Sequence, residues 1–142
     1  MGVMRNVSHV LAALFNDRAE FNRRWNEPPA RPEGLEGRWQ GEWVSEANGH
    51  RGALRCLMTK ARDGGYEAAF HATYARFLAV AYTVTLQGAA EGGKWRLEGQ
   101  ADLGQLAGGV YHYKGDGDES AFDCAYRCAY DHGTFHLRRL PL

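Results

Sequence analysis

The chain has 142 residues, of which 44% are hydrophobic and 12% aromatic, and its 17 basic residues balance its 17 acidic ones. This length suits one domain with one core, and the hydrophobic content excludes a disordered chain. The zero net charge and the lack of a basic stripe argue against a nucleic-acid partner. No apolar run is long enough to span a membrane, and residues 1–6 lack the features of a secretory signal, so we expect a cytoplasmic protein.

The first 37 residues divide into a helical segment and a linker. Apolar residues recur at three- and four-residue steps within residues 1–25 and predict two helices, over 3–15 and 18–25. Residues 26–37 hold three of the four prolines, which end the helical pattern and mark a linker. We expect the helical segment to pack on the barrel that follows or to plug it.

Residues 38–140 are predicted to form this β-barrel. The stretch between Pro32 and Pro141 contains no proline, as expected where every strand donates its ladder hydrogen bonds. Short breaks with turn residues favour antiparallel hairpins between neighbouring strands. The eight predicted strands cover 38–46, 52–61, 65–74, 77–87, 93–103, 106–114, 120–130 and 133–140.

Apolar and polar residues alternate along most of these strands. In the fifth strand, Trp95 and Leu97 share one face, and Lys94, Arg96 and Glu98 share the other. One apolar and one polar face is typical of an antiparallel sheet with one side buried. Eight such strands in sequence close most simply into an up-and-down barrel without open edges. The predicted fold class is therefore all-β with N-terminal helices.

Two short stretches carry a resemblance to a known group. Gly37-Arg38-Trp39 begins the first strand, and Arg138 and Arg139 end the last. Together with the strand pattern over residues 37–140, they resemble the calycin group, which comprises lipocalins, fatty-acid-binding proteins and avidins. The resemblance implies a lipocalin-like barrel in which Trp39 packs under one of the two arginines, a contact that guanidinium–aromatic attraction favours. It implies no particular ligand, because the helical segment here precedes the first strand.

The topology predicts two different barrel ends. The helical segment joins the first strand, so we expect Val10, Leu14, Phe21 and Trp25 to plug that end. The opposite end, where ligands commonly bind, is then an open mouth with many polar residues. These are Ser45, Asn48, His50, Tyr74, Arg76, Gln105, Asp131 and His132.

Aromatic residues dominate the predicted interior. An eight-stranded barrel is just wide enough to be filled by its own side chains or to hold one small ligand. Small residues on the inward faces, such as Ala68, Ala72 and Gly99, favour some free space. The aromatic residues expected to face the lumen are Trp43, Tyr66, Phe70, Tyr74, Trp95, Tyr111, Tyr113, Tyr126 and Tyr130.

The cysteines and histidines give weaker indications. Cys56, Cys124 and Cys128 are an odd number, so we expect buried thiols rather than a disulfide scaffold. His71, His112 and His136 are out of phase with the apolar faces and are expected to point outward. We expect neither a metal nor a cofactor.

The sequence therefore predicts a carrier or sensor that binds a small, mostly apolar or aromatic molecule in the barrel lumen. Two alternatives stay open. One is a cofactor-independent enzyme of the cyclase, isomerase or decarboxylase type, with His50 or His132 near Asp131 as acid and base. The other is a structural or partner-binding protein with a filled barrel, and a homodimer is also left open. The predicted ligand-binding residues are Trp43, Phe70, Tyr74, Arg76, Tyr111, Tyr126, Tyr130 and His132.

Overall fold

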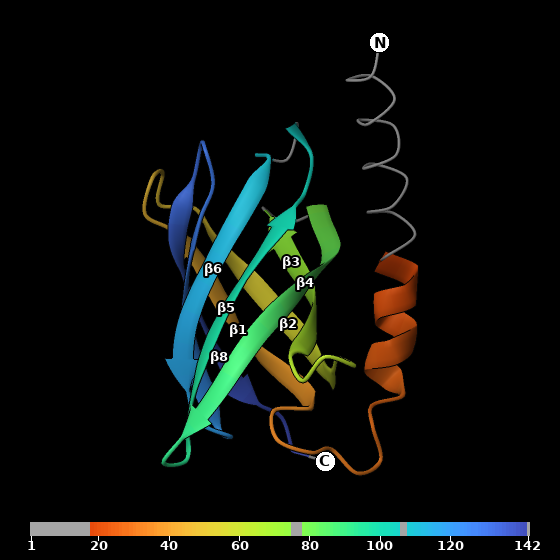
Figure 1. Ribbon diagram of the computed structural model, residues 1–142. Coiled ribbons are helices and arrows are strands. Elements are labelled where there is room, and N and C mark those ends of the chain that lie inside the picture. Colours follow the sequence, from red (N-terminus) through yellow and green to blue (C-terminus); the bar gives the residue numbers. More distant parts are fainter. Residues whose placement is uncertain (1–17, 75–77, 106–107, 142) are drawn as a thin grey trace.

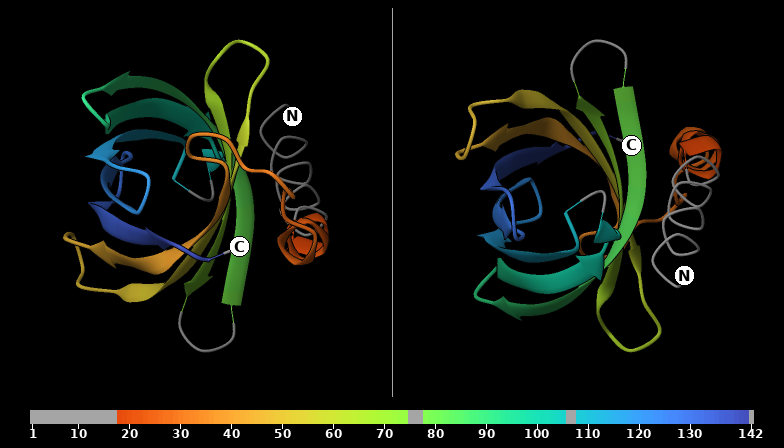
Figure 2. Two further views of the ribbon diagram at one scale, coloured as in Figure 1. Left: turned by 90° about the horizontal axis from the view of Figure 1, so that it is seen from below. Right: turned by 90° about the horizontal axis from the view of Figure 1, so that it is seen from above.

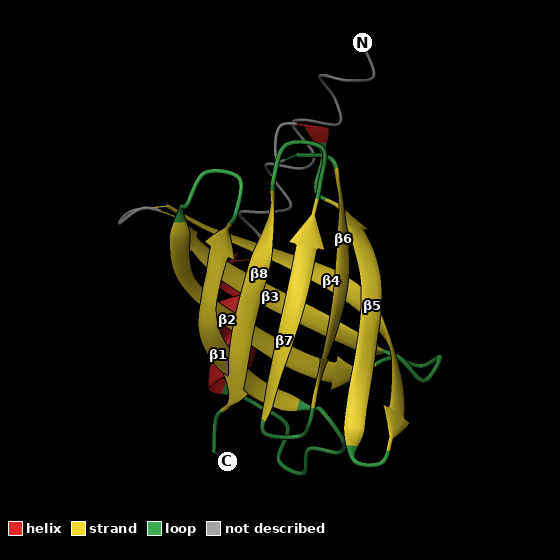
Figure 3. Cartoon of the chain, turned by 90° about the vertical axis from the view of Figure 1, so that its left-hand side faces the viewer, coloured by secondary structure: helices red, strands yellow, loops and turns green. Residues whose placement is uncertain are grey.

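A computed structural model of the chain describes residues 18–74, 78–105 and 108–141. Eight antiparallel strands form a closed barrel in which sequence neighbours pair and β8 pairs with β1 (Figures 1 and 3). The predicted up-and-down, eight-stranded barrel is confirmed. The strands are β1 (Gly37–Ser45), β2 (Arg51–Lys60), β3 (Tyr66–Tyr74), β4 (Leu78–Glu91), β5 (Lys94–Asp102), β6 (Val110–Gly117), β7 (Ala121–Arg127) and β8 (His132–Arg139).

The predicted strand boundaries need correction mainly in β4, β6 and β7. β4 ends at Glu91 rather than at residue 87. β6 begins at Val110 rather than at residue 106. β7 ends at Arg127 rather than at residue 130. The reason in β7 is a turn, because the Cys128 N–H donates a hydrogen bond to the Asp131 carbonyl over 2.8 Å. Tyr130 therefore belongs to this turn and not to a strand.

The inward faces of the strands build one continuous core. Its members are spread around the whole ring, so each strand is held by contacts with several others. The rings in the middle of the barrel pack closely, with Phe70 stacked on Tyr82 at a centroid distance of 5.3 Å. Phe70 is fully buried and also meets Phe135 edge to face at 5.5 Å. Side chains therefore fill the middle of the barrel.

The described part of the helix, residues 18–26, lies against the outer wall of the barrel (Figure 2). Phe21 is buried there against Leu57, Ala69 and Ala81, which face outward from β2, β3 and β4, and Trp25 packs beside them. The expectation that Phe21 and Trp25 plug one end of the barrel is wrong. Apolar residues on the outer face of β2–β4 give the helix a place to bury its stripe.

Residues Val10 and Leu14, the other two members of the expected plug, lie outside the described residues.

The contact between the helix and the barrel wall also includes two basic side chains. The guanidinium of Arg55 lies 5.1 Å from the ring centroids of both Phe21 and Trp25. His71 stacks on Phe21 at 5.3 Å, as an outward-facing residue that the helix covers. Burial, together with the charges of Arg55 and Arg18, lowers the pKa of His71.

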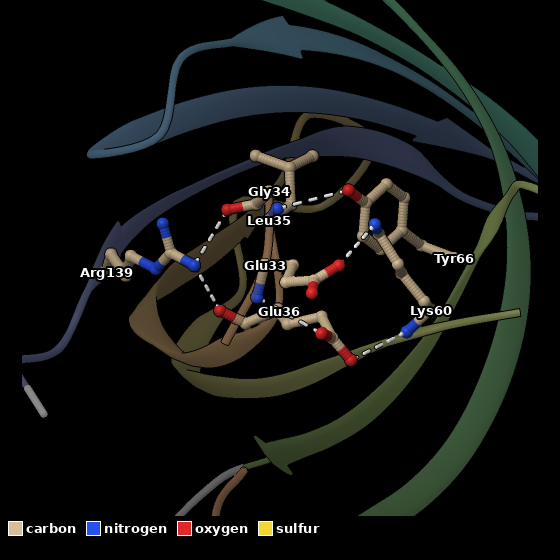
Figure 4. Close-up of polar contacts among 7 residues, drawn as sticks. All are labelled: Glu33, Gly34, Leu35, Glu36, Lys60, Tyr66 and Arg139. Atoms are coloured by element: carbon tan, nitrogen blue, oxygen red, sulfur yellow. Dashed lines mark hydrogen bonds and ion pairs between the residues drawn. The ribbon is translucent and has the colours of Figure 1, made fainter. Parts of the chain in front are cut away.

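The chain that leads into β1 closes one end of the barrel (Figure 4). Leu35, a residue of the predicted linker, is 1% exposed and belongs to the core. Its N–H donates to the Tyr66 hydroxyl over 3.2 Å, and its carbonyl accepts the indole N–H of Trp39 over 2.9 Å. Gly34 makes this approach possible, since a Cβ there would lie 2.3 Å from the Tyr66 oxygen and its φ is +58°.

Arg139 fastens the same closing segment from the other side. It donates hydrogen bonds to the carbonyl of Gly34 over 2.8 Å and to the carbonyl of Glu36. Its guanidinium carbon lies 5.4 Å from the ring centroid of Trp39. The predicted contact between Trp39 and a terminal arginine is therefore confirmed, with Arg139 as the partner.

We expect Tyr66→Phe to destabilise the protein by about 1–3 kcal/mol, because the N–H of Leu35 would stay buried without an acceptor. The free energy of unfolding in urea measures this loss. Tyr130→Phe removes a hydroxyl from an exposed side chain and should leave the stability close to that of the wild type. Equal stability of the Tyr66→Phe variant and the wild type would contradict the role given to this bond.

Phe21→Ala should destabilise the protein by about 3 kcal/mol, because it removes a buried ring from the contact between helix and wall. The same urea titration measures the effect. Arg23→Ala, on the exposed side of the same helix, is the matched control and should change little. If Phe21→Ala were as harmless as the control, the helix would not be packed on the barrel as described.

Candidate functional site

A small cavity lies inside the barrel near the end that carries the β1–β2 and β7–β8 turns. Its volume is about 30 Å³, which is room for about one or two water molecules. Six of its lining residues are aromatic and one is a carboxylate. The lining consists of Trp43, Leu54, Ala72, Tyr82, Tyr111, Tyr113, Tyr126, Asp131 and Phe135.

Larger hollows exist, but they lie on the outer wall. One, of about 900 Å³, extends across the strands from β4 to β8, and another, of about 680 Å³, extends from β5 to β8. Exposed charged side chains such as Arg96, Glu98 and Lys114 line them. We take the small inner cavity as the candidate site, because ligand sites are concave, mostly apolar and contain a few convergent polar groups.

Asp131 is held at the edge of this cavity by two hydroxyl groups. Ser45 donates to one carboxylate oxygen over 2.5 Å, and Tyr126 donates to the other over 3.2 Å. The Ser45 oxygen is buried and in turn accepts the N–H groups of Ala47 and Asn48, at 3.2 and 3.3 Å. This network joins the β1–β2 turn to the β7–β8 turn and fixes the position of the carboxylate.

Trp43 forms part of the cavity wall next to this network. Its indole N–H donates to the carbonyl of Thr73 over 3.1 Å, which ties β1 to β3 over Gly52 of the intervening strand β2. Tyr111 and Tyr126 stand opposite each other with ring centroids 6.3 Å apart. The side chains of Tyr82 and Tyr111 are only partly buried, whereas Tyr113 and Phe135 beneath them are buried.

The structure brings together some of the predicted ligand-binding residues. Trp43, Tyr111 and Tyr126 line the cavity, whereas Phe70 lies outside its lining, in the packed middle of the barrel. Of the expected lumen residues, Tyr66 belongs to the closed end, and Trp95 is partly buried beside it at a centroid distance of 5.5 Å.

Tyr130 and His132 lie away from the cavity. Tyr130 is 81% exposed, so its expected place in the lumen is wrong, and the reason is the earlier end of β7. His132 is exposed at the start of β8. Arg76 lies outside the described residues, and nothing is described for the side chain of Tyr74.

Sequence reasoning passed over three lining residues as site candidates, namely Leu54, Tyr82 and Phe135, whereas Asp131 was expected at the mouth beside His50 and His132. Tyr82 had a usable signal, because it is in phase with Val80 and Val84 on the inward face of β4. The position of Asp131 depends on where β7 ends, which the sequence pattern did not give.

The histidines do not gather into a site in the described part of the chain. His50 and His132 are both exposed, although their loops meet. The meeting point is the bond between Ser45 and Asp131. Among residues 18–74, 78–105 and 108–141 there is no group of three His, Cys, Asp or Glu placed to hold a metal ion. No helix within the same ranges has the length and apolarity needed to cross a membrane.

Two of the three thiols are shielded by the barrel. Cys56 and Cys124 are buried in the core, and burial raises the pKa of both. For Cys124 it rises to about 12. Cys128 is only partly buried, at the turn that follows β7. All three are free thiols.

These features define a class of protein: a closed eight-stranded antiparallel barrel, packed in its middle, with a small aromatic cavity near one end. No family model matches the chain, and a search of curated proteins also finds no match. Among solved structures, the chain is similar to a de novo designed fluorescence-activating β-barrel, with a TM-score of 0.53 and 14% identity. That match covers 74% of this chain and 93% of the designed one.

A redesigned β-barrel is similar to the same degree, with a TM-score of 0.53 and 13% identity. That match covers 75% of this chain and 92% of the redesigned one. At such identities the likeness concerns the fold alone.

We expect Cys128 to be alkylated by iodoacetamide at pH 8 well before Cys56 and Cys124. Only the thiolate reacts, and the raised pKa of the two buried thiols leaves them protonated at that pH. Mass spectrometry of peptides after timed exposure measures the order. Equal alkylation of all three cysteines in the folded protein would contradict the packed interior, and alkylation in denaturant supplies the control.

Proposed function

We propose that the barrel binds a small, mostly apolar or aromatic molecule at the end that carries the β1–β2 and β7–β8 turns, as a carrier or sensor. The observation that supports this most is the cavity itself, which lies among six aromatic side chains with Leu54 and Ala72. Aromatic walls with one fixed polar group are typical of small-molecule sites. We also propose that the barrel is related to the calycins, since the stack of Arg139 on Trp39 has the arrangement that this resemblance implies.

The cavity must enlarge to admit a ligand, because about 30 Å³ is smaller than any drug-sized molecule needs. Tyr82 and Tyr111 are the lining rings that are partly buried, so they have a route toward solvent. Their rotation would open the site and would break the stack of Tyr82 on Phe70, while Phe70 would keep its edge-to-face contact with Phe135. The proposed ligand therefore replaces these tyrosine side chains at this end of the barrel.

The similar designed barrel is described as fluorescence-activating, which supports an optical probe as the first test ligand. A filled barrel with a structural role is the second candidate, favoured by the close packing around Phe70. The two candidates differ in one measurable property, the saturable uptake of a neutral apolar molecule.

N-phenyl-1-naphthylamine, a neutral dye that brightens in apolar surroundings, should bind with a stoichiometry near one. Ala72→Val adds methyl groups to the cavity wall and should weaken binding by about tenfold or more. Ala125→Val makes the same change on the exposed outer face of β7 and should leave binding unchanged. Fluorescence titration measures both, after thermal unfolding shows that each variant is folded.

Absence of saturable dye uptake by the wild type would reject the binding function and leave the filled barrel. Uptake that Ala72→Val does not weaken would place the dye elsewhere and would also contradict the proposal.

A further inference from the structure

We propose that the cavity recognises a primary ammonium group, so that the ligand is a small organic amine with an apolar or aromatic body. This inference rests on the proposed function and names the ligand class for the same site. It follows from the charge, the rings and the size of the cavity, which are considered in turn.

The described lining carries a negative charge and no positive one. Among the lining residues that the structure describes, Asp131 is the one ionisable group other than the tyrosines, and none is a lysine, an arginine or a histidine. Both hydrogen bonds that Asp131 receives come from uncharged hydroxyls, those of Ser45 and Tyr126. None of the ion pairs found among the described residues involves Asp131. The carboxylate therefore lies beside the cavity without a protein counter-ion in this part of the chain.

The carboxylate also keeps capacity to accept further hydrogen bonds. A carboxylate offers about four acceptor positions on its two oxygens. Each oxygen of Asp131 accepts one hydrogen bond, from Ser45 on one side and from Tyr126 on the other. An ammonium group carries three donors, and bonds between it and a carboxylate are among the stronger ones in proteins.

The aromatic lining favours the same kind of group. A cation is attracted to the face of a tryptophan or tyrosine ring within about 6 Å of its centroid. Trp43 and Tyr126 both border the cavity that Asp131 borders. Rings of this kind would repel an anionic group on their faces, and so would the carboxylate. The lining therefore selects for a cation over an anion.

The size of the cavity fits an ammonium group better than a bulkier cation. The space of about 30 Å³ suits a group of the size of one or two water molecules, which an –NH₃⁺ group resembles. The apolar body of the ligand would then occupy the space that Tyr82 and Tyr111 leave on opening. This arrangement joins the ammonium site to the apolar site in one ligand.

The test compares 2-phenylethylamine with 2-phenylethanol by isothermal titration calorimetry at pH 7. The two molecules share shape and ring, and only the amine is charged at this pH. We expect the wild type to bind the amine about tenfold or more tightly than the alcohol. Asp131→Asn should reduce this preference to about twofold or less, because the amide keeps an acceptor oxygen but removes the charge.

A further variant controls for folding and for long-range charge effects. Asp116→Asn removes a carboxylate from the exposed outer face of β6 and should keep the full preference for the amine. The comparison of amine with alcohol in the wild type depends on no variant.

Equal binding of amine and alcohol, tighter binding of the alcohol, or binding of neither would overturn the ammonium site. So would a preference that survives in Asp131→Asn or disappears in Asp116→Asn. Uptake of N-phenyl-1-naphthylamine distinguishes the two failures, since it persists if only the ammonium site is wrong and is absent if the binding function itself is wrong.

Discussion

The pairing of β1 with β8 is the constraint on which the rest of the molecule depends. It turns a meander of hairpins into a ring and gives every strand two partners. The two strands come so close that a Cβ on Gly41 would lie 1.7 Å from the carbonyl oxygen of His136. The register of this pair then sets both ends of the barrel, with Trp39 opposite Arg139 at one end and Ser45 opposite Gly133 at the other.

The two ends differ because different segments meet at each. At the closed end, Leu35 enters the core, and Arg139 donates hydrogen bonds to the backbone carbonyls on either side of it, those of Gly34 and Glu36. At the other end, the Ser45–Asp131 bond draws two turns together but leaves a cavity behind them. The proposed binding function and the proposed ammonium site both follow from this difference, because free space and a fixed carboxylate occur together at one end.

Much of the fold could be predicted because its signals are local: turn residues mark the breaks, and alternation marks the faces. Local signals do not determine where the helix packs, because the apolar stripe of Phe21 and Trp25 could be buried at one end of the barrel as well as on its outer wall. A signal was present in β2 and β3, where Leu57 and Ala69 interrupt the alternation and are buried on the outward face. The cavity was harder to predict, because its volume depends on how the rings around Phe70 pack. Tyr130 lies outside the lumen because β7 ends earlier than the sequence pattern indicates.

The indole N–H signals of three tryptophans test the central claim most directly, since these three side chains lie in different places. Trp43 borders the cavity, Trp39 lies at the closed end, and Trp25 lies on the outer wall. In a ¹⁵N-edited NMR titration with N-phenyl-1-naphthylamine, the account predicts a saturable shift of the Trp43 signal while those of Trp25 and Trp39 stay in place. A shift confined to Trp25, or no shift at Trp43 when the dye is bound, would contradict it.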